Sequence, residues 1–274
     1  SRGLGDVYKR QGRSMDFDDL RSYVPGDDVK DIDWKSSARA GELLIKSYRA
    51  ERRHTLAFVV PTGGSLASAA TLTHSKIDVV LATIGVLAWV ACHQGDYVTV
   101  VAPGQDGPSV ARPSYRDTQI EHMLAGLDAG CRLEAPDPDL VELLDLTASG
   151  LRRRCIVVVV LDDWDPRPAD VDALASLCAR HEVLAIEVSD LDLTDPALAV
   201  VPTRDQASGQ PVPGFVARDR QVREQAVAAR QERARRRGHT LDRLGIIHES
   251  VADVDDSIAA IVRLLERMRH ASRH

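Results

Sequence analysis

The sequence has few of the features that mark several large classes of protein. It contains 4 cysteines and 4% aromatic residues among 274 positions, and no two cysteines form a C-x-x-C pair. A disulfide framework and a thiolate zinc site are therefore not predicted, and the cysteines are expected to be reduced in a cytoplasmic protein. The net charge of -6 also argues against nucleic acid as a partner, because phosphate binding depends on an excess of Lys and Arg.

Long hydrophobic runs and cofactor motifs are missing as well. The longest apolar stretch, residues 79–92, is shorter than the ~20 residues that a membrane span needs, so no span is expected in this chain. There is no G-x-x-x-x-G-K-[ST] or G-x-G-x-x-G loop for a nucleotide and no H-E-x-x-H for zinc. Residues 1–11 are expected to be a non-native or disordered leader.

From residue 55 onward, short apolar runs alternate with helical patterns, which predicts an α/β fold with a mostly parallel sheet and helices on both faces. The predicted strands are residues 56–60, 97–101, 155–161, 183–188 and 245–247. The predicted helices are residues 76–93, 118–127, 140–153, 169–180, 218–237 and 254–268, the first with Ser75 as its N-cap. We predict one domain, residues 55–270, together with an extended arm formed by residues 12–54.

The carboxyl ends of these strands are where an enzyme with such a sheet would carry its chemistry. The stretch ending at Ser65 is one residue short of a G-x-S-x-G elbow, and the order Ser65, Asp162 or Asp163, then His248 is that of an α/β-hydrolase. An elbow needs a helix at the nucleophile, whereas the helix cap is predicted at Ser75. No catalytic residue is therefore predicted, and a serine hydrolase is the alternative.

Acids and bases alternate in the arm around Trp34. Pro25 and Gly26 predict a turn, which Asp27 and Asp28 can cap. Around the buried ring of Trp34, an ion-pair network is expected from Asp28, Lys30, Asp31, Asp33, Lys35 and Arg39. We interpret the network as a structural clasp that fixes the arm on the sheet, with a ligand site as the alternative.

Residues 17–39 resemble the signature of the family called domain of unknown function 58. The pattern F-x-x-L-R-x-Y-x-P-G-D-D is matched from Phe17 to Asp28, and I-D-W-x-x-x-A-R from Ile32 to Arg39. The resemblance extends over nearly everything after residue 11. It implies a von Willebrand factor A-like fold and an association with MoxR-type AAA+ ATPases. Members often carry upstream transmembrane helices, which would tether the domain to the inner face of the membrane.

The resemblance also implies a metal-ion-dependent adhesion site, with D-x-S-x-S after the first strand, a later Thr and a final Asp. Here Pro61 and Gly63 replace the first Asp and Ser, Ser65 remains, and Asp162 or Asp163 stands for the final acid. Residues 132–137 offer no matching Thr. We predict a degenerate site that binds Mg²⁺ weakly, because this ion needs several oxygen ligands, and we expect no cofactor. A metal-dependent adhesion domain is a further alternative.

The resulting prediction is a non-enzymatic module that binds a protein partner. The resemblance implies that it works with a MoxR-type AAA+ ATPase in the assembly or activation of a client complex. The docking surfaces of the module would be the strand-end loops and the arm around residues 27–39. Residues 218–237 carry eight arginines among three acids and are expected to form a solvated helix, with an acidic partner or anionic lipid as the alternative.

Overall fold

The computed structural model describes residues 17–24, 32–48, 54–104, 107–195, 197–198, 201–206, 208–213 and 215–271. The chain divides into two compact units, unit 1 (Ser1–Arg52) and unit 2 (Arg53–His274), so the division lies close to the predicted start of the α/β domain. The predicted leader, residues 1–11, lies outside the described residues. That the arm and the α/β part act as one domain stays a prediction.

Unit 1 has more structure than the extended arm that we predicted. Strands β1 (Phe17–Ser22) and β2 (Leu44–Tyr48) pair antiparallel, and helix α1 (Trp34–Ala40) lies between them in the chain. Asp33 caps α1, because its Oδ1 accepts hydrogen bonds from the backbone N–H groups of Lys35 at 3.1 Å and Ser36 at 3.0 Å. Gly41 ends the helix with a φ of 74°, a conformation that favours glycine.

Unit 2 contains a six-stranded sheet in the order β5-β4-β3-β6-β7-β8. Its strands are β3 (Thr55–Val59), β4 (Tyr97–Gly104), β5 (Gly107–Val110), β6 (Ile156–Leu161), β7 (Glu182–Val188) and β8 (Ile247–Val251). All neighbours are parallel except β4 and β5. Counted along the chain, this is the doubly wound order 3-2-1-4-5-6. The predicted fold class is confirmed, although the edge strand β5 was not predicted and β8 lies further along the chain than expected.

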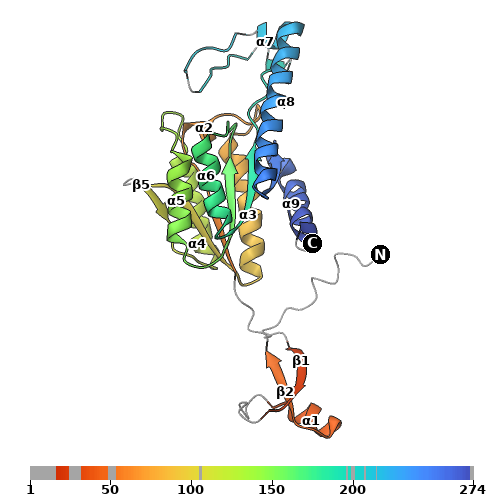
Figure 1. Cartoon of the computed structure of the whole chain (residues 1–274). Helices are drawn as coiled ribbons and strands as arrows, with labels where there is room; N and C mark the ends of the chain where they lie inside the picture. The colour runs from red at the N-terminus through yellow and green to blue at the C-terminus, as the bar shows by residue number, and fades with distance from the viewer. Residues whose placement is uncertain are drawn as a thin grey trace. The chain divides into compact units, whose positions relative to one another are not determined.

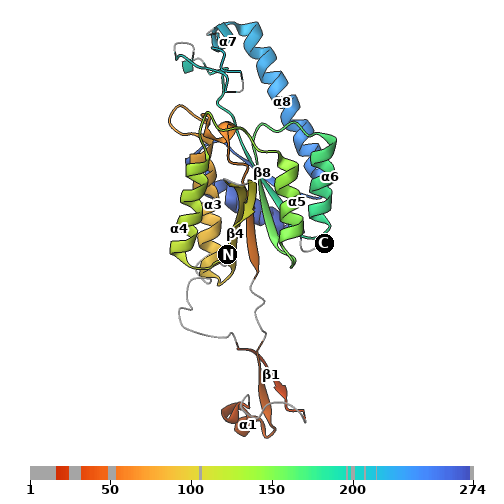
Figure 2. The ribbon, with the colours of Figure 1, turned by 90° about the vertical axis from the view of Figure 1, so that its left-hand side faces the viewer.

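Helices cover both faces of the sheet. One face carries α3 (Lys76–His93), α4 (Asp117–Gly130) and α9 (Ser257–Ala271), as Figures 1 and 2 show. The other carries α5 (Leu140–Gly150), α6 (Pro168–Cys178) and α8 (Arg220–Arg243). Two single-turn helices, α2 (Gly64–Ala67) and α7 (Phe215–Arg218), and the 3₁₀ helix η4 (Val254–Asp256) lie in the connections.

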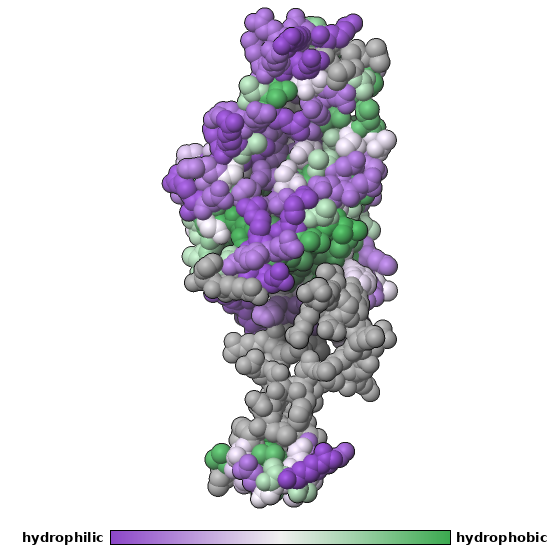
Figure 3. Space-filling view, turned by 90° about the vertical axis from the view of Figure 1, so that its right-hand side faces the viewer, coloured by the Kyte–Doolittle hydropathy of each residue, from purple (hydrophilic) through white to green (hydrophobic). Residues whose placement is uncertain are grey.

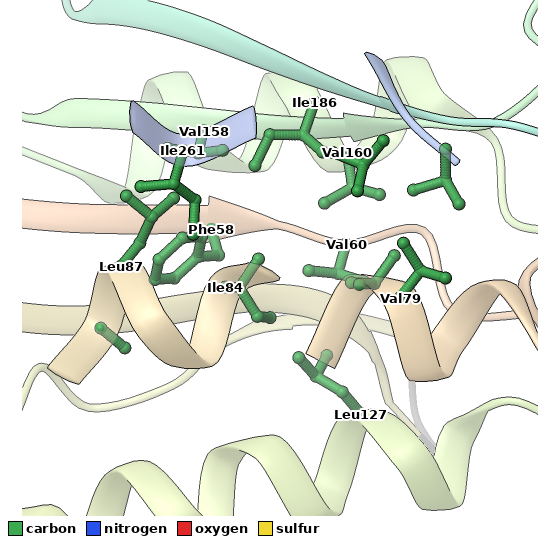
Figure 4. Packing of buried hydrophobic residues seen from close by; sticks show 14 of the residues in the cluster. Phe58, Val60, Val79, Ile84, Leu87, Leu127, Val158, Val160, Ile186 and Ile261 are labelled. Carbon is green, nitrogen blue, oxygen red and sulfur yellow. The ribbon is translucent and has the colours of Figure 1, made fainter. Parts of the chain in front are cut away.

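The alternation of side chains along β6 builds both halves of the core. Val158 and Val160 pack on the α3 side, close to Phe58 and Ile84, as Figure 4 shows. The intervening Val157 and Val159 belong to the cluster on the opposite face. β6 lies between β3 and β7, so the prediction that this uninterrupted apolar run forms a central strand is confirmed.

Helix α3 begins as predicted, with Ser75 as the N-cap in a reciprocal capping box with Asp78. Its apolar side chains Ile77, Val80 and Ile84 are buried in the core of unit 2. By length and composition α3 could nevertheless cross a membrane, and it is the one such helix in the described part of the chain. The absence of a membrane span therefore stays a prediction.

The cysteines are free thiols in this structure. Cys155 is buried, and Cys92, Cys131 and Cys178 are partly buried. Burial raises the pKa of all four thiols, and raises that of Cys131 to about 11. They are therefore protonated and poorly nucleophilic at neutral pH.

Candidate functional site

A cleft of about 590 Å³ opens at the carboxyl ends of the strands in unit 2. It lies next to β3 and β6, the neighbouring strands from which the chain continues in opposite directions, where doubly wound sheets bind ligands. Of the predicted site residues, Pro61, Ser65, Asp162 and Asp163 line this cleft. The cleft is acidic, and its aspartates are Asp137, Asp139, Asp162, Asp163, Asp165, Asp170 and Asp190.

The acids at the ends of β6 and β7 are bridged by Lys76, the first residue of α3. Lys76 Nζ lies 2.6 Å from Asp162 Oδ1 and also donates a hydrogen bond to Asp190 Oδ1. The other oxygen of Asp162 accepts a hydrogen bond from the hydroxyl of Ser65. The Lys76 side chain is only 3% exposed. We call Ser65, Lys76, Asp162 and Asp190 the Lys76 cluster.

Lys76 and Asp190 of this cluster shift each other's pKa values. Burial opposes the charged form of Lys76, but the carboxylates of Asp162 and Asp190 outweigh it and raise its pKa above the usual value. Burial raises the pKa of Asp190, and the neighbouring carboxylates of Asp162 and Asp163 add to this effect while Lys76 opposes it. The cluster therefore holds an ammonium group at neutral pH, shared by two carboxylates.

The glycines before Ser65 allow a close approach between two loops. The backbone N–H of Gly64 donates to Ala135 O at 3.1 Å, and that of Ser65 donates to Asp137 Oδ1 at 2.8 Å. A Cβ atom on Gly63 would lie 2.6 Å from Asp137 Oδ1, closer than carbon and oxygen can pack. A serine therefore does not fit at position 63 unless residue 137 moves.

The residues do not fit the metal site that the sequence resemblance implies. Pro61 and Gly63 supply no side-chain oxygen, and the available oxygens of Ser65 and Asp162 are engaged in the Lys76 cluster. Within the described ranges, no group of three or more His, Cys, Asp or Glu residues is arranged to hold a metal ion. Asp162 contacts Ser65 and Lys76, whereas Asp163 pairs with Arg237 of α8.

Helix α8 covers the acids on the other side of the strand ends. Arg237 is 12% exposed, and its Nη1 and Nε lie 2.6 Å from Asp163 Oδ1 and 3.0 Å from Glu187 Oε2. Arg230 donates a hydrogen bond of 2.9 Å to the backbone oxygen of Asp190. Figure 3 shows how hydrophilic the surface is at the α7 and α8 end of unit 2. The prediction of a solvated helix was therefore incomplete, because one face of α8 pairs with acids of the same chain.

The structure does not assemble the hydrolase triad among the described residues. His248 Nδ1 lies 3.0 Å from Glu187 Oε1 and its Nε2 lies 3.4 Å from Asp242 Oδ1, while the Ser65 hydroxyl binds Asp162. One sequence argument against the triad was wrong, because a helical turn, α2, does begin next to Ser65. The argument against a serine hydrolase is that Ser65 and His248 each contact different acids. The position of the helix boundary does not argue against it.

In unit 1, the signature residues occupy the start and end of α1. Trp34 is 64% exposed, contrary to the expectation that its ring is buried, and Arg39 is exposed in the last turn. Trp34, Ser37 and Leu43 line a shallow groove. The predicted residues Asp27, Asp28 and Asp31 lie outside the described residues, so the ion-pair network stays a prediction.

A sequence model described as "Protein of unknown function DUF58" matches residues 19–236, which include most of unit 2 and nearly all of the N-terminal signature. The chain belongs to the DUF58 family. Two similar proteins are the uncharacterized proteins Mb1516 of Mycobacterium bovis and Rv1480 of Mycobacterium tuberculosis. Each is 30% identical over 198 residues, covering 69% of this chain and 60% of the relative. The chain thus spans less than two thirds of their length.

Solved structures resemble this DUF58 chain more distantly. BatB from Bacteroides thetaiotaomicron has a TM-score of 0.47 and 14% identity, covering 79% of this chain and 99% of that one. A von Willebrand factor type A protein from Catenulispora acidiphila has a TM-score of 0.36 and 15% identity, covering 57% and 40%. The doubly wound α/β fold of the DUF58 chain is shown by its own strand order and helix layers.

Sequence reasoning missed Lys76, which bridges two of the acids that line the DUF58 cleft. Lys76 follows the N-cap Ser75, and a cation is disfavoured at a helix N-terminus because the helix dipole is positive there. That unfavourable position is a signal that acids lie nearby. The sequence shows Asp190 only as an acid that follows a predicted strand. Its partner Lys76 lies 114 residues away in the chain, so no local pattern links the two.

Proposed function

We propose that this DUF58 chain is a non-enzymatic protein-interaction module whose partner is a MoxR-type AAA+ ATPase. The observation that carries this proposal is the exposed ring of Trp34, which lies within the family signature at the start of α1. Tryptophan buries a large area when a partner covers it and is enriched among the residues that dominate binding energy. Leu43, also exposed, lines the same groove and extends its apolar surface.

The cleft of unit 2 offers a second docking surface. Its walls are loops at the ends of β3, β6 and β7, held by a rigid sheet, which is the usual place for binding residues. Its acids favour a partner segment that carries basic or hydrogen-bond-donating groups. The proposed docking does not require a resident metal, since the adhesion-type site is degenerate at Pro61 and Gly63.

The absence of enzymatic activity belongs to the same proposal. A serine nucleophile needs a base that accepts its proton, and in this structure the Ser65 hydroxyl faces the carboxylate of Asp162, which itself binds Lys76. We place the module in the cytoplasm, free or held at the inner face of the membrane by segments beyond this chain.

The direct test is a binding measurement between the purified chain and a purified MoxR-type ATPase encoded in the same genome. The matched variants are Trp34→Ala and Trp89→Ala, because Trp89 is also about half exposed but lies on α3. We expect Trp34→Ala to weaken binding by about tenfold or more, and Trp89→Ala to change it by less than about twofold.

Two results would contradict the proposal. If the wild-type chain does not bind the ATPase at concentrations of about 100 µM, far above those of specific complexes, this partner is wrong. If Trp34→Ala and Trp89→Ala weaken binding equally, the signature does not form the docking surface. Asp33→Ala, which removes the cap of α1, is expected to weaken binding in the same direction as Trp34→Ala.

A further inference from the structure

The Lys76 cluster brings together the kinds of oxygen that bind hard cations. Carboxylates come from the ends of two neighbouring strands, Asp162 after β6 and Asp190 after β7, and Ser65 after β3 adds a hydroxyl. Carboxylate and hydroxyl oxygens are suitable ligands for Mg²⁺, Mn²⁺ and Ca²⁺. In this chain the cation between the carboxylates is the ammonium group of Lys76.

The ammonium group is well placed to exclude a metal ion. It is covalently held by a side chain that is almost wholly buried, so it cannot diffuse away from Asp162 and Asp190. A divalent ion entering the cluster would meet a positive charge within a few ångströms, and the two carboxylates cannot offset three positive charges. It would also have to displace hydrogen bonds that Lys76 already makes.

We infer that Lys76 is a tethered cation that replaces a divalent metal between Asp162, Asp190 and Ser65, and that removing its charge converts the cluster into a divalent-cation site. The inference is independent of the proposed partner, since it concerns only the chemistry of unit 2. It gives a physical reason why a fold that resembles metal-dependent adhesion domains can keep its strand-end acids together without a metal.

The test is Mn²⁺ binding to the whole chain carrying Lys76→Met, which keeps an unbranched side chain one atom shorter and removes its charge. We expect Mn²⁺ to bind this variant at least about tenfold more tightly than wild type by calorimetry, and to raise its melting temperature by mass action. Lys35→Met is the matched control, because it removes the same charge from an exposed residue of α1. Adding Asp162→Asn to Lys76→Met should abolish the gain.

The inference is overturned if Lys76→Met melts cooperatively and its response to Mn²⁺ does not exceed that of Lys35→Met. A second measurement avoids any substitution at position 76. Mn²⁺ should shift the melting temperatures of wild type and of Asp162→Asn equally, because Lys76 excludes the ion from the wild-type cluster. A stabilisation of wild type that Asp162→Asn removes would show a metal already bound there, and would equally overturn the inference.

Discussion

Arg237 Nη1 lies 2.6 Å from Asp163 Oδ1, although 74 residues separate them in the chain. Through this contact α8 is fixed against the loop that follows β6. The same guanidinium group reaches Glu187 on β7, so one arginine connects the loop after β6 to β7. The strand-end region is thus held by two cations, Lys76 from α3 and Arg237 from α8.

The first prediction concerns Arg237→Ala. This substitution leaves Glu187 and Asp163 without their shared partner, and we expect it to lower the free energy of unfolding by about 2–3 kcal/mol, somewhat less than for a fully buried pair. The control is Arg235→Ala on the same helix. The Arg235 side chain is 76% exposed, so its removal should change the free energy of unfolding by less than about 0.5 kcal/mol. Urea unfolding of both variants measures the difference, and equal losses would contradict the assigned role.

The second prediction concerns pH. The hydrogen bond that His248 donates to Glu187 raises the pKa of His248 above its usual 6.5, so this contribution to stability is complete below that pH and is lost as the pH rises through the raised pKa. Burial opposes ionisation of Glu187, but hydrogen bonds from His248 and Arg237 lower its pKa. The stability that ionised Glu187 contributes is therefore lost only as the pH falls through this lowered pKa.

Melting temperatures measured from mildly acidic to alkaline pH check this dependence. Wild type should lose stability toward alkaline pH, and His248→Asn should flatten that part of the profile because residue 248 no longer titrates. Parallel profiles for the two proteins would show that the pair of Glu187 and His248 does not contribute.

A third prediction concerns the glycines beside Ser65. A Cβ atom on Gly64 would lie 2.8 Å from the backbone oxygens of Ala135 and Leu133, so Gly64→Ala should destabilise the chain by about 1–3 kcal/mol. Gly126→Ala is the control, because nothing lies within 4 Å of the added atom and alanine favours the helix by about 0.5–1 kcal/mol. The melting temperature should therefore fall for Gly64→Ala and rise for Gly126→Ala. An unchanged melting temperature for Gly64→Ala would contradict the close packing of the two loops.

The fourth prediction concerns the stability of the Lys76 cluster. Lys76→Met leaves Asp162 and Asp190 facing each other without a cation and should cost about 2–4 kcal/mol, the range allowing for the partial exposure of Asp190. Adding Asp190→Asn removes one of the opposed charges and should restore about 1 kcal/mol. Chemical denaturation of the single and double variants tests this, and strictly additive losses would show that the two residues do not interact.

A fifth prediction separates the binding module from the hydrolase alternative. Ser65 faces Asp162, and both ring nitrogens of His248 contact other acids, so a fluorophosphonate probe should not label the chain at Ser65. Mass spectrometry of the treated protein decides the point, with Ser65→Ala as the control. An adduct on Ser65 that the control lacks would reverse the assignment.

Local signals predicted much of the fold. The start of α3 could be predicted because Ser75 and Asp78 form a capping box within one turn, and β6 because it is an apolar run without interruption. Strand β5 is short and exposed at the sheet edge, and β1 pairs with a strand more than 20 residues away, so neither has a strong local pattern. The role of Asp33 as the cap of α1 was obscured by the expectation of an ion-pair network.

The sequence by itself determined the α/β class, the order of most elements and the family, because these depend on periodicity, caps and a continuous motif. Only the tertiary structure decided that Asp162 binds Ser65 and Lys76 whereas Asp163 binds Arg237, that Lys76 lies between two acids, and that Trp34 is exposed. The physical reason is that charge pairing and burial depend on residues brought together by the sheet. Their distance along the chain carries no information about whether they meet.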